Sequence, residues 1–310
     1  MKKNWPPKTP VPKNNEKKVA IGVSQWNIAW RRFRKNKAAL LGAFIIGFVV
    51  FLGLFDALIA PFPPNASPGF YIGEARVPPS LKYFFGTDYV GHDVFSQVVY
   101  GARSALYVGF GAAAIAMSLA VLVGLVSGYY GGIVDNILMR ITEIFLVIPF
   151  LLILLVFLKV ITAIAPSGMG GLSIVTLMIG IFSWAGFARI IRGEVLRVKE
   201  SEFIEASKSL GANNRRIIFR HIFPNVLHLI IVLTTLMIAN AILTEAAVSF
   251  LGFGDANSIT WGQLLQKANE AVKEAWWEGV FPGLFITLLV LGFNLLGNGL
   301  RDALDPRLRE

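Results

Sequence analysis

The sequence predicts an all-α integral membrane protein with six transmembrane helices. Of its 310 residues, 55% are hydrophobic and only 15% are charged, and the mean hydropathy is +0.62. Soluble domains are rarely so apolar. The apolar residues are gathered into six blocks that charged segments separate. Because lipid offers no partners for backbone N–H and C=O groups, each block is expected to satisfy these groups internally, as a helix.

The chain begins with a polar region that precedes the first span. Residues 1–25 are rich in Lys, Pro and Asn and are expected to form a disordered, basic cytoplasmic tail. Residues 26–37 mix Trp and Phe with Arg and Lys, which predicts an interfacial amphipathic segment at the membrane surface. The first span, 38–60, carries one charge, Asp56. It is too long, and begins too far along the chain, for a cleaved signal, so it is expected to remain as an anchor.

The other five blocks are also long enough to cross a hydrocarbon core of ~30 Å. The predicted spans are 104–127, 141–158, 171–188, 226–252 and 279–300. They are separated by an outer loop at 61–103, a polar segment at 195–225 and a second outer loop at 253–278. Residues 38–310 are therefore expected to form one membrane domain.

The distribution of Lys and Arg sets the predicted orientation. If both termini are cytoplasmic, 23 of the 29 Lys and Arg residues fall in cytoplasmic segments. The six that fall outside are Arg76, Lys82, Arg103, Lys159, Lys267 and Lys273. Since positive loops are retained in the cytoplasm, this asymmetry predicts a multi-pass protein of the plasma membrane with its N-terminus inside. The formal net charge of +10 follows from this topology, so no nucleic-acid partner is expected.

The segment 195–225 is a polar, basic insert between two apolar blocks. A short helical turn should open at Glu205 and end at Gly211, which permits a positive φ. A second helix should follow, with one apolar face formed by Ile217, Ile218, His221 and Ile222, and Pro224 should end it and begin the next span. The composition alone fits either an amphipathic loop on the lipid headgroups or a docking element for another protein.

The sequence contains no ATP-binding motif and no recognisable catalytic centre. The run at 211–216 lacks the second Gly and the Lys that a GxxxxGK[ST] phosphate loop needs. Zero cysteines exclude disulfides and thiol-ligated zinc. The three histidines, His92, His221 and His228, lie in different settings, so no metal site is expected. Paired carboxylates, or a nucleophile with its base, would be needed in an integral membrane enzyme, and neither is evident.

Several motifs follow one another in a fixed order along residues 26–307. They are FGTDYVGHDVFS at 85–96, YGARSAL at 100–106, DNILMR at 135–140, EAS at 205–207 followed by Gly211, HIFPN at 221–225, FLGFG at 250–254, WG at 261–262, FPG at 281–283 and NLLGNGLRDALDPR at 294–307. This series resembles the C-type permease subunit of dipeptide, oligopeptide and nickel ABC importers. Against that pattern, His92 and Gln97 stand where Arg is usual, Ser207 replaces the second Ala of the EAA loop, and His221 and Phe223 replace Ile and Leu.

The resemblance implies a type I ABC importer permease bundle without a catalytic site, cofactor or metal of its own. ATP and Mg²⁺ would be bound by two separate ABC ATPase subunits. Coupling to them would use Glu205, Ala206, Ser207, Leu210, Gly211, Ala212, Arg216, Phe219, His221, Pro224 and Asn225. A homologous second permease subunit, forming a heterodimer, and an extracytoplasmic solute-binding protein would complete an importer of di- or oligopeptides or related solutes. The outer-loop motif of the family falls on Gly86, Thr87, Asp88, Gly91 and Asp93.

Polar residues within the spans are candidates for the pathway or for helix packing, because charges in a bilayer are costly. Glu245 either has a functional role, in which it faces the pathway or pairs with Arg103, or is only a structural helix contact. Asn240 and Asn294 have the same two interpretations, while Glu143 is expected to pair with Arg140. A secondary transporter without an ATPase is the alternative function. It would show broken helices and ion sites in repeated halves, whereas the sequence offers Glu245 alone and no internal repeat.

Overall fold

The computed structural model describes residues 30–63, 75–164, 170–269 and 273–304. The regular elements in those ranges are helices, and the same ranges contain one isolated β-bridge, between Thr87 and Asp93, and no extended strand. In chain order the helices are α2 (Lys37–Leu54), α3 (Asp56–Ile59), α4 (Val94–Tyr130), α5 (Gly132–Val147), α6 (Phe150–Ile164), α7 (Gly171–Lys199), α8 (Glu202–Ser209), α9 (Asn214–Arg216), η3 (Ile217–Ile222), α10 (Phe223–Phe250), α11 (Trp261–Ala268) and α12 (Trp277–Leu304). The predicted tail at 1–25 and residues 26–29 of the interfacial segment lie outside the described residues.

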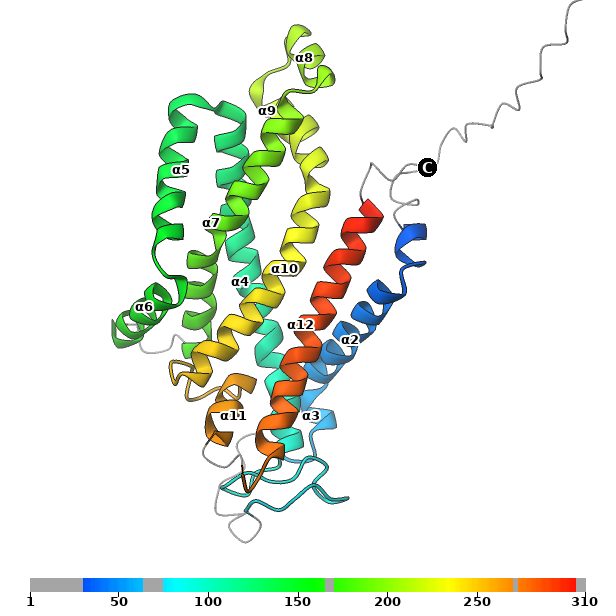
Figure 1. The fold of residues 1–310 in the computed structure, drawn as a ribbon, viewed down its shortest axis with the longest axis vertical. Coiled ribbons are helices and arrows are strands. Elements are labelled where there is room, and N and C mark those ends of the chain that lie inside the picture. The colour runs from blue at the N-terminus through cyan, green and yellow to red at the C-terminus, as the bar shows by residue number, and fades with distance from the viewer. Residues whose placement is uncertain (1–29, 64–74, 165–169, 270–272, 305–310) are drawn as a thin grey trace, which may run out of the picture.

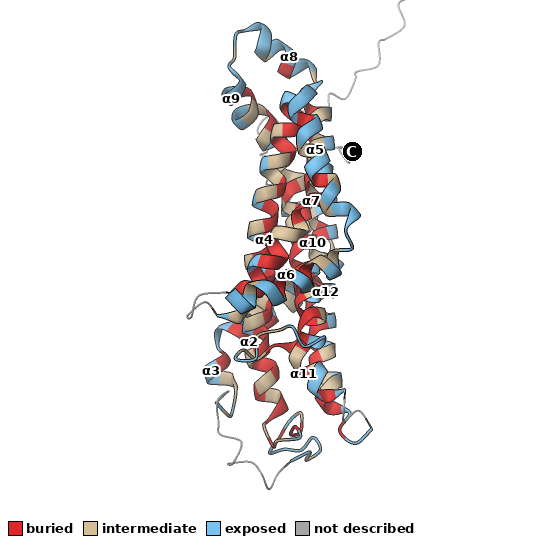
Figure 2. Ribbon diagram, turned by 90° about the vertical axis from the view of Figure 1, so that its left-hand side faces the viewer, coloured by how far each residue is buried: buried red, intermediate tan, exposed pale blue. Residues whose placement is uncertain are grey.

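The long helices stand side by side in one bundle (Figure 1). Five of the described helices are long and apolar enough to cross a membrane, and the pair α5 and α6 provides a sixth crossing if it is taken as one span. Buried residues run along α4, α7 and α10, whereas α5 and α8 are largely exposed (Figure 2). The prediction of an all-α membrane bundle is therefore confirmed.

The prediction of a continuous third span at 141–158 was wrong. The chain bends by 88° between α5 and α6, and the bend falls at Ile148 and Pro149. Proline has no N–H to continue the helical ladder, and it disfavours the helical conformation of the residue before it. Accordingly, Ile148 has extended dihedral angles (φ −76°, ψ 130°). Hydropathy does not reveal this break, because apolar residues continue on both sides of it.

Several helices extend beyond their apolar blocks. α4 begins at Val94, inside the predicted outer loop, because the side chain of Asp93 caps its first turn. α7 continues to Lys199. The first span is shorter than predicted, since α2 ends at Leu54 and α3 follows after Phe55. The second outer loop contains the short helix α11.

The pair α4 and α7 is packed through small residues. A Cβ added at Gly124 would lie 2.8 Å from Cβ of Ile191, and one added at Gly128 would lie 2.7 Å from Cγ1 of Val195. On the other helix, a Cβ at Gly180 would lie 2.7 Å from Cβ of Ile115. Close contact of this kind drives helix association in lipid, where the hydrophobic effect between helices is absent.

The helices α2 and α12 cross in a similar way. A Cβ at Gly42 would lie 2.6 Å from the carbonyl oxygen of Gly292, and one at Gly299 would lie 2.2 Å from Cβ of Ala39. Gly47, on the same helix as Gly42, has no atom within 4 Å of such a Cβ. The first helix is thus fixed to the last by backbone proximity along one side only.

We expect Gly42→Leu to destabilise the bundle, because overpacking a close helix contact costs about 1–3 kcal/mol. The midpoint of thermal unfolding, followed by size-exclusion chromatography in mild detergent, should fall. Gly47→Leu is the matched control and should leave the midpoint unchanged. Equal midpoints for the two variants would show that α2 does not pack against α12 in this register.

Candidate functional site

The segment 195–225 forms one tip of the bundle, where α8 lies beyond the ends of α7 and α10 (Figure 1). Its first part is the end of α7, which is followed by the short helix α8. The chain then returns through α9 and the π-helical stretch η3 into α10. The expected pair of short helices is therefore present. α8 begins at Glu202, so Glu205 lies in its first turn.

The turn between the two helical parts is a Schellman motif. Gly211 has a φ of +76°. Its N–H donates to the carbonyl oxygen of Lys208 at 2.9 Å, and the N–H of Ala212 donates to that of Ser207 at 3.1 Å. These two bonds satisfy carbonyls that the end of α8 would otherwise leave unpaired. The positive φ expected at Gly211 is confirmed.

Apolar side chains and two polar contacts fix this segment to the bundle. Ile204, Ile217 and Ile222 are fully or almost fully buried and belong to the main apolar core. At the end of α4, the hydroxyl of Tyr129 donates to Oδ1 of Asn214 at 2.8 Å. The side chain of Asn213 caps the returning helix by accepting from the N–H of Arg216 at 2.8 Å. The segment is thus a braced element of two helices.

The outer side of the segment carries exposed apolar residues beside charges. Leu210 is 88% exposed and Phe219 is 67% exposed. The predicted coupling residues Glu205, Ala206, Gly211, Arg216, Pro224 and Asn225 are also exposed, whereas Ser207, Ala212 and His221 are half-buried. Large apolar side chains exposed next to charged ones are typical of a surface that contacts another protein.

Pro224 begins the fifth span, as the sequence predicts, but the helix before it does not end there. The π-helical stretch η3 passes directly into α10, and Pro224 lies in the first turn of α10. There the missing N–H of proline is tolerated, and the N–H of Phe223 donates to the carbonyl oxygen of Ile218, five residues earlier. The side-chain amide of Asn225 donates to the carbonyl oxygen of His221 at 2.6 Å. The segment is therefore rigidly continuous with the fifth span.

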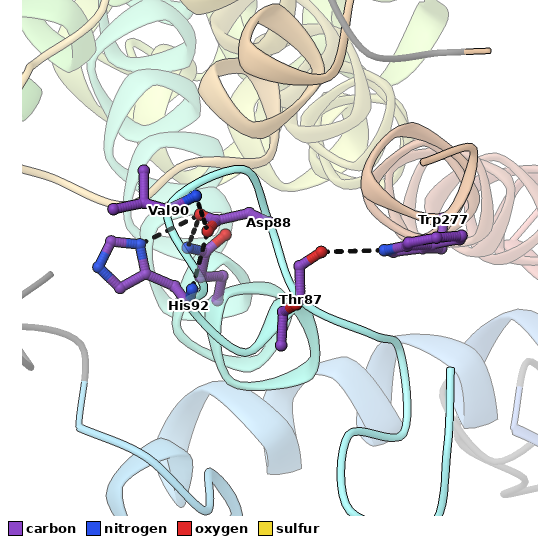
Figure 3. Close-up of polar contacts among 6 residues, drawn as sticks. Thr87, Asp88, Val90, His92 and Trp277 are labelled. Atoms are coloured by element: carbon purple, nitrogen blue, oxygen red, sulfur yellow. Dashed lines mark hydrogen bonds and ion pairs between the residues drawn. The ribbon is translucent and has the colours of Figure 1, made fainter. Parts of the chain in front are cut away.

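At the other end of the bundle, residues 76–93 form a folded ledge centred on Asp88 (Figure 3). Oδ1 of Asp88 accepts from the N–H groups of Val90 at 2.9 Å and His92 at 2.8 Å. Oδ2 accepts from the side chain of Gln97 at 2.9 Å and lies 3.1 Å from Nδ1 of His92. His92 and Gln97 are the two positions at this end of the bundle that depart from the importer pattern. Both contact the same carboxylate.

The ledge packs on the start of α12. The indole N–H of Trp277 donates to the carbonyl oxygen of Thr87 at 3.0 Å (Figure 3). The ring of Phe85 stacks on that of Phe281, with a centroid distance of 3.8 Å. Gly86 has a φ of +74°, and a Cβ there would lie 2.7 Å from Nε1 of Trp277. Two motifs nearly 200 residues apart in the sequence therefore form one structural unit.

Asp93 connects the ledge to α4. Its Oδ2 accepts from the N–H of Ser96 at 2.8 Å and from the hydroxyl of Ser96 at 2.7 Å. Burial raises the pKa of the Asp93 carboxyl, and its hydrogen bonds with Ser96 act in the opposite direction. Gly91 has a φ of +89°, which closes the hairpin before Asp93. The outer-loop motif residues thus have structural partners within this chain.

The polar residues of the spans have different settings. The predicted pair of Glu245 with Arg103 is absent: Oε1 of Glu245 accepts from the hydroxyl of Ser249 at 2.6 Å, while Arg103 lies 3.6 Å from Oδ2 of Asp56. Glu245 is buried, so the structural interpretation fits it better. Asn294 is half-buried on α12. The predicted pair of Arg140 and Glu143 is confirmed at 3.1 Å.

Asn240 lines a pocket, together with the span residues Ser183 and Thr244. The pocket has a volume of about 480 Å³ and lies between the bend at Pro149 and the middle parts of α7 and α10. Sequence reasoning did not find this pocket, because it depends on the break in the third span. It also missed the ion pair in which Arg192 of α7 donates to Asp135 of α5 at 2.6 and 2.5 Å. Across the ranges placed by the structure, no group of three or more His, Cys, Asp or Glu residues is arranged to hold a metal ion.

Comparison with known proteins gives two family matches. Residues 120–310 match the family described as binding-protein-dependent transport system inner membrane component. Residues 24–79 match the N-terminal TM domain of oligopeptide transport permease C.

Individual relatives cover almost the whole chain. The dipeptide transport system permease protein DppC of Bacillus subtilis is 41% identical over 286 residues, which are 91% of this chain and 86% of that protein. The oligopeptide transport system permease protein OppC of Bacillus subtilis is 37% identical, over 95% of this chain and 94% of that protein. The glutathione transport system permease protein GsiD of Pectobacterium atrosepticum is 35% identical, over 92% of each chain.

Solved structures share the fold at lower identity. A chain of the MetNI methionine ABC transporter, in inward facing conformations, superposes with a TM-score of 0.55. The match covers 67% of this chain and 97% of that chain, at 21% sequence identity. The arrangement of the helices is thus one that is already known.

The turn at Gly211 should tolerate Asn but not Val. No atom lies within 4 Å of a Cβ at this position, so the penalty comes from the left-handed backbone alone, about 1–2 kcal/mol for a residue other than Gly or Asn. Hydrogen exchange of the amides at 211 and 212 should be faster in Gly211→Val than in Gly211→Asn. Equal exchange in both variants would mean that this turn does not hold the segment.

The cap of α4 gives a second prediction. Asp93→Ala should lower the free energy of unfolding by about 1 kcal/mol, because the first turn loses its acceptor. Asp93→Asn keeps an acceptor and avoids the burial of a charge. The raised pKa makes the wild type lose stability as the pH rises through that pKa, whereas the amide variant should not. The unfolding midpoints of the wild type and the two variants, measured at several pH values, test this prediction. An equal decrease of the midpoint in Asp93→Ala and Asp93→Asn would refute it.

Proposed function

The chain belongs to the family of binding-protein-dependent transport system inner membrane components, and on this basis we propose that it forms half of the pathway of an ATP-driven peptide importer. Both termini would lie in the cytoplasm, and a homologous second permease subunit would supply the other half. Two ABC ATPase subunits would bind ATP and Mg²⁺, and an extracytoplasmic binding protein would deliver the solute. The names of the relatives, which transport dipeptides, oligopeptides and glutathione, support a peptide as the solute.

The observation that carries this proposal is the braced tip formed by 195–225. A coupling element must transmit force, so it has to be rigid, joined to the spans and open to a partner. The Schellman turn at Gly211 and the contact between Tyr129 and Asn214 make the segment rigid. The direct passage of η3 into α10 joins it to a span. The exposed side chains of Leu210 and Phe219 leave an apolar surface for the ATPase.

The side of the bundle formed by α5 supports a second subunit. This helix is ion-paired to α7 through Asp135 and Arg192, but much of its surface is apolar and open. Ile133 is 78% exposed and Val147 is 82% exposed. Lipid accepts such a surface, and so does a homologous permease subunit packed through the same helices.

One feature favours the secondary-transporter alternative, namely the broken helix at Pro149. That alternative also needs a charged site in the membrane that binds a coupling ion. Glu245 is hydrogen-bonded to Ser249 and buried within the packing of α10, which leaves it little room for such a role. The broken helix fits a permease pathway equally well, so the ATP-driven function is preferred.

Glu205→Lys and Gly211→Pro should uncouple the importer without preventing membrane insertion. The first reverses an exposed charge on α8, and the second imposes a negative φ and removes the N–H that donates to Lys208. We expect peptide uptake in membrane vesicles to fall about tenfold or more, which corresponds to a loss of roughly 1.4 kcal/mol of docking free energy.

Glu202→Lys is the matched control, since it makes the same charge change in the same exposed turn outside the EAA pattern. It should retain uptake close to that of the wild type. The amount of each variant in the membrane fraction must be equal. Wild-type uptake by both Glu205→Lys and Gly211→Pro would reject the coupling role.

A further inference from the structure

The pocket at the bend between α5 and α6 has a composition suited to a neutral ligand. Its wall is made of Phe145, Leu146, Val147, Ile148, Pro149, Phe150, Phe182, Ser183, Ala185, Gly186, Phe187, Met237, Asn240, Leu243 and Thr244. No charged side chain is among them. Four phenylalanines provide apolar surface, and three neutral polar groups are placed between them. A volume near 480 Å³ is within the range of ~300–1,000 Å³ that is usual for small-molecule sites.

The polar side chains of this pocket have no hydrogen-bond partner among the described residues. Seven hydroxyls elsewhere in the spans donate to a carbonyl of their own helix at 2.6–2.8 Å, namely those of Ser118, Thr142, Thr162, Thr176, Thr234, Thr235 and Thr287. Ser183, Asn240 and Thr244 make no hydrogen bond among the residues that the structure places, and neither does Ser104 near the outer end of α4. Three unpaired polar groups around one cavity would be costly against lipid, which indicates that the cavity receives a polar ligand or water.

The backbone at the bend adds acceptors to the same wall. The last carbonyls of α5 have no partners within the helix, and Pro149 has no N–H to offer to Phe145. Residues 145–150 all line the pocket. The cavity therefore offers backbone carbonyls together with an amide and hydroxyls that both donate and accept. A peptide bond presents the complementary donor and acceptor.

Gly186 keeps the pocket open. It is exposed on α7, and no atom lies within 4 Å of a Cβ built on it. At other glycines of α7 and α4, such as Gly180 and Gly124, a neighbouring helix occupies the space where a Cβ would lie. The space beside Gly186 is thus not used for helix packing and is available to a ligand.

From these observations we propose that the pocket binds the amide backbone and an apolar side chain of a peptide as it crosses the membrane. The inference rests on the proposed function and adds a place of contact and a selectivity to it. Asn240 is the residue that hydrogen-bonds the peptide bond, and the phenylalanines accept the side chain. A bare metal ion or a strongly charged solute finds no counter-charge here, and a lipid chain would leave Asn240 unpaired.

The test uses the complete importer, reconstituted in vesicles with its partner subunits and binding protein, and two radiolabelled probes, Ala-Ala and Phe-Phe. Gly186→Leu narrows the pocket, so the ratio of Phe-Phe to Ala-Ala uptake should fall about tenfold relative to the wild type, as steric discrimination in apolar pockets allows. The selectivity of the binding protein is common to all variants and cancels from this comparison. Asn240→Leu keeps the approximate volume and should lower the uptake of both probes, whereas Asn240→Gln should restore part of it.

Gly47→Leu is the matched control, because it adds the same side chain at an equally open glycine of α2, away from the pocket. It should leave both the uptake ratio and the basal ATPase rate unchanged. A wild-type ratio in Gly186→Leu together with wild-type uptake in Asn240→Leu would overturn the inference and leave the proposed function standing. Absence of ATP-dependent uptake of either probe by the wild type would overturn both. A lipid that co-purifies with the wild type but not with Gly186→Leu, at an unchanged uptake ratio, would also overturn the inference.

Discussion

The close contact between α4 and α7 is the constraint on which the rest of the structure depends. Glycines at 124, 128 and 180 let the two helices approach until a single added carbon would collide with the partner. In a membrane, where lipid is as apolar as any side chain, such proximity supplies the attraction that a hydrophobic core supplies in water. α10 packs on both members of this pair, and α12 packs in turn on α10 and α2.

The same pair connects the two ends of the molecule. At one end, α4 begins at Asp93 and so carries the ledge, which in turn is held by Trp277 of the last helix. At the other end, Tyr129 of α4 holds the short helix α9 of the 195–225 segment, and α7 leads directly into this segment. The ion pair of Arg192 with Asp135 places α5 on α7, and thereby places the bend at Pro149 beside Asn240. A movement of the braced tip would thus be transmitted along α7 and α10 to the pocket.

Much of this architecture could be predicted from the sequence, because each membrane-spanning helix requires a long block of apolar residues. Blocks of apolar residues predicted the five long apolar helices and their approximate positions, and Gly211 predicted a positive φ at the turn between the short helices. The sequence pattern failed where structure depends on contacts between distant residues. Hydropathy is unchanged through Pro149, so the 88° bend was missed. The partner of Arg103 is Asp56, from another helix. Pro224 does not interrupt the helix, because the backbone N–H groups of η3 already donate to carbonyls five residues earlier instead of four.

The proposed function requires the 195–225 tip to dock an ATPase on the cytoplasmic side. Since the chain contains no cysteine, a single Leu210→Cys variant can be labelled with a maleimide that carries a photoreactive diazirine, joined by light to whichever protein lies beside it in membranes, and the adduct identified by mass spectrometry. Leu81→Cys, at a position that is 96% exposed on the ledge, is the control. The account predicts an adduct of Leu210→Cys with a P-loop ATPase and none of Leu81→Cys with that protein. No ATPase adduct at Leu210→Cys in membranes that take up peptide, or the same adduct at both positions, would contradict it.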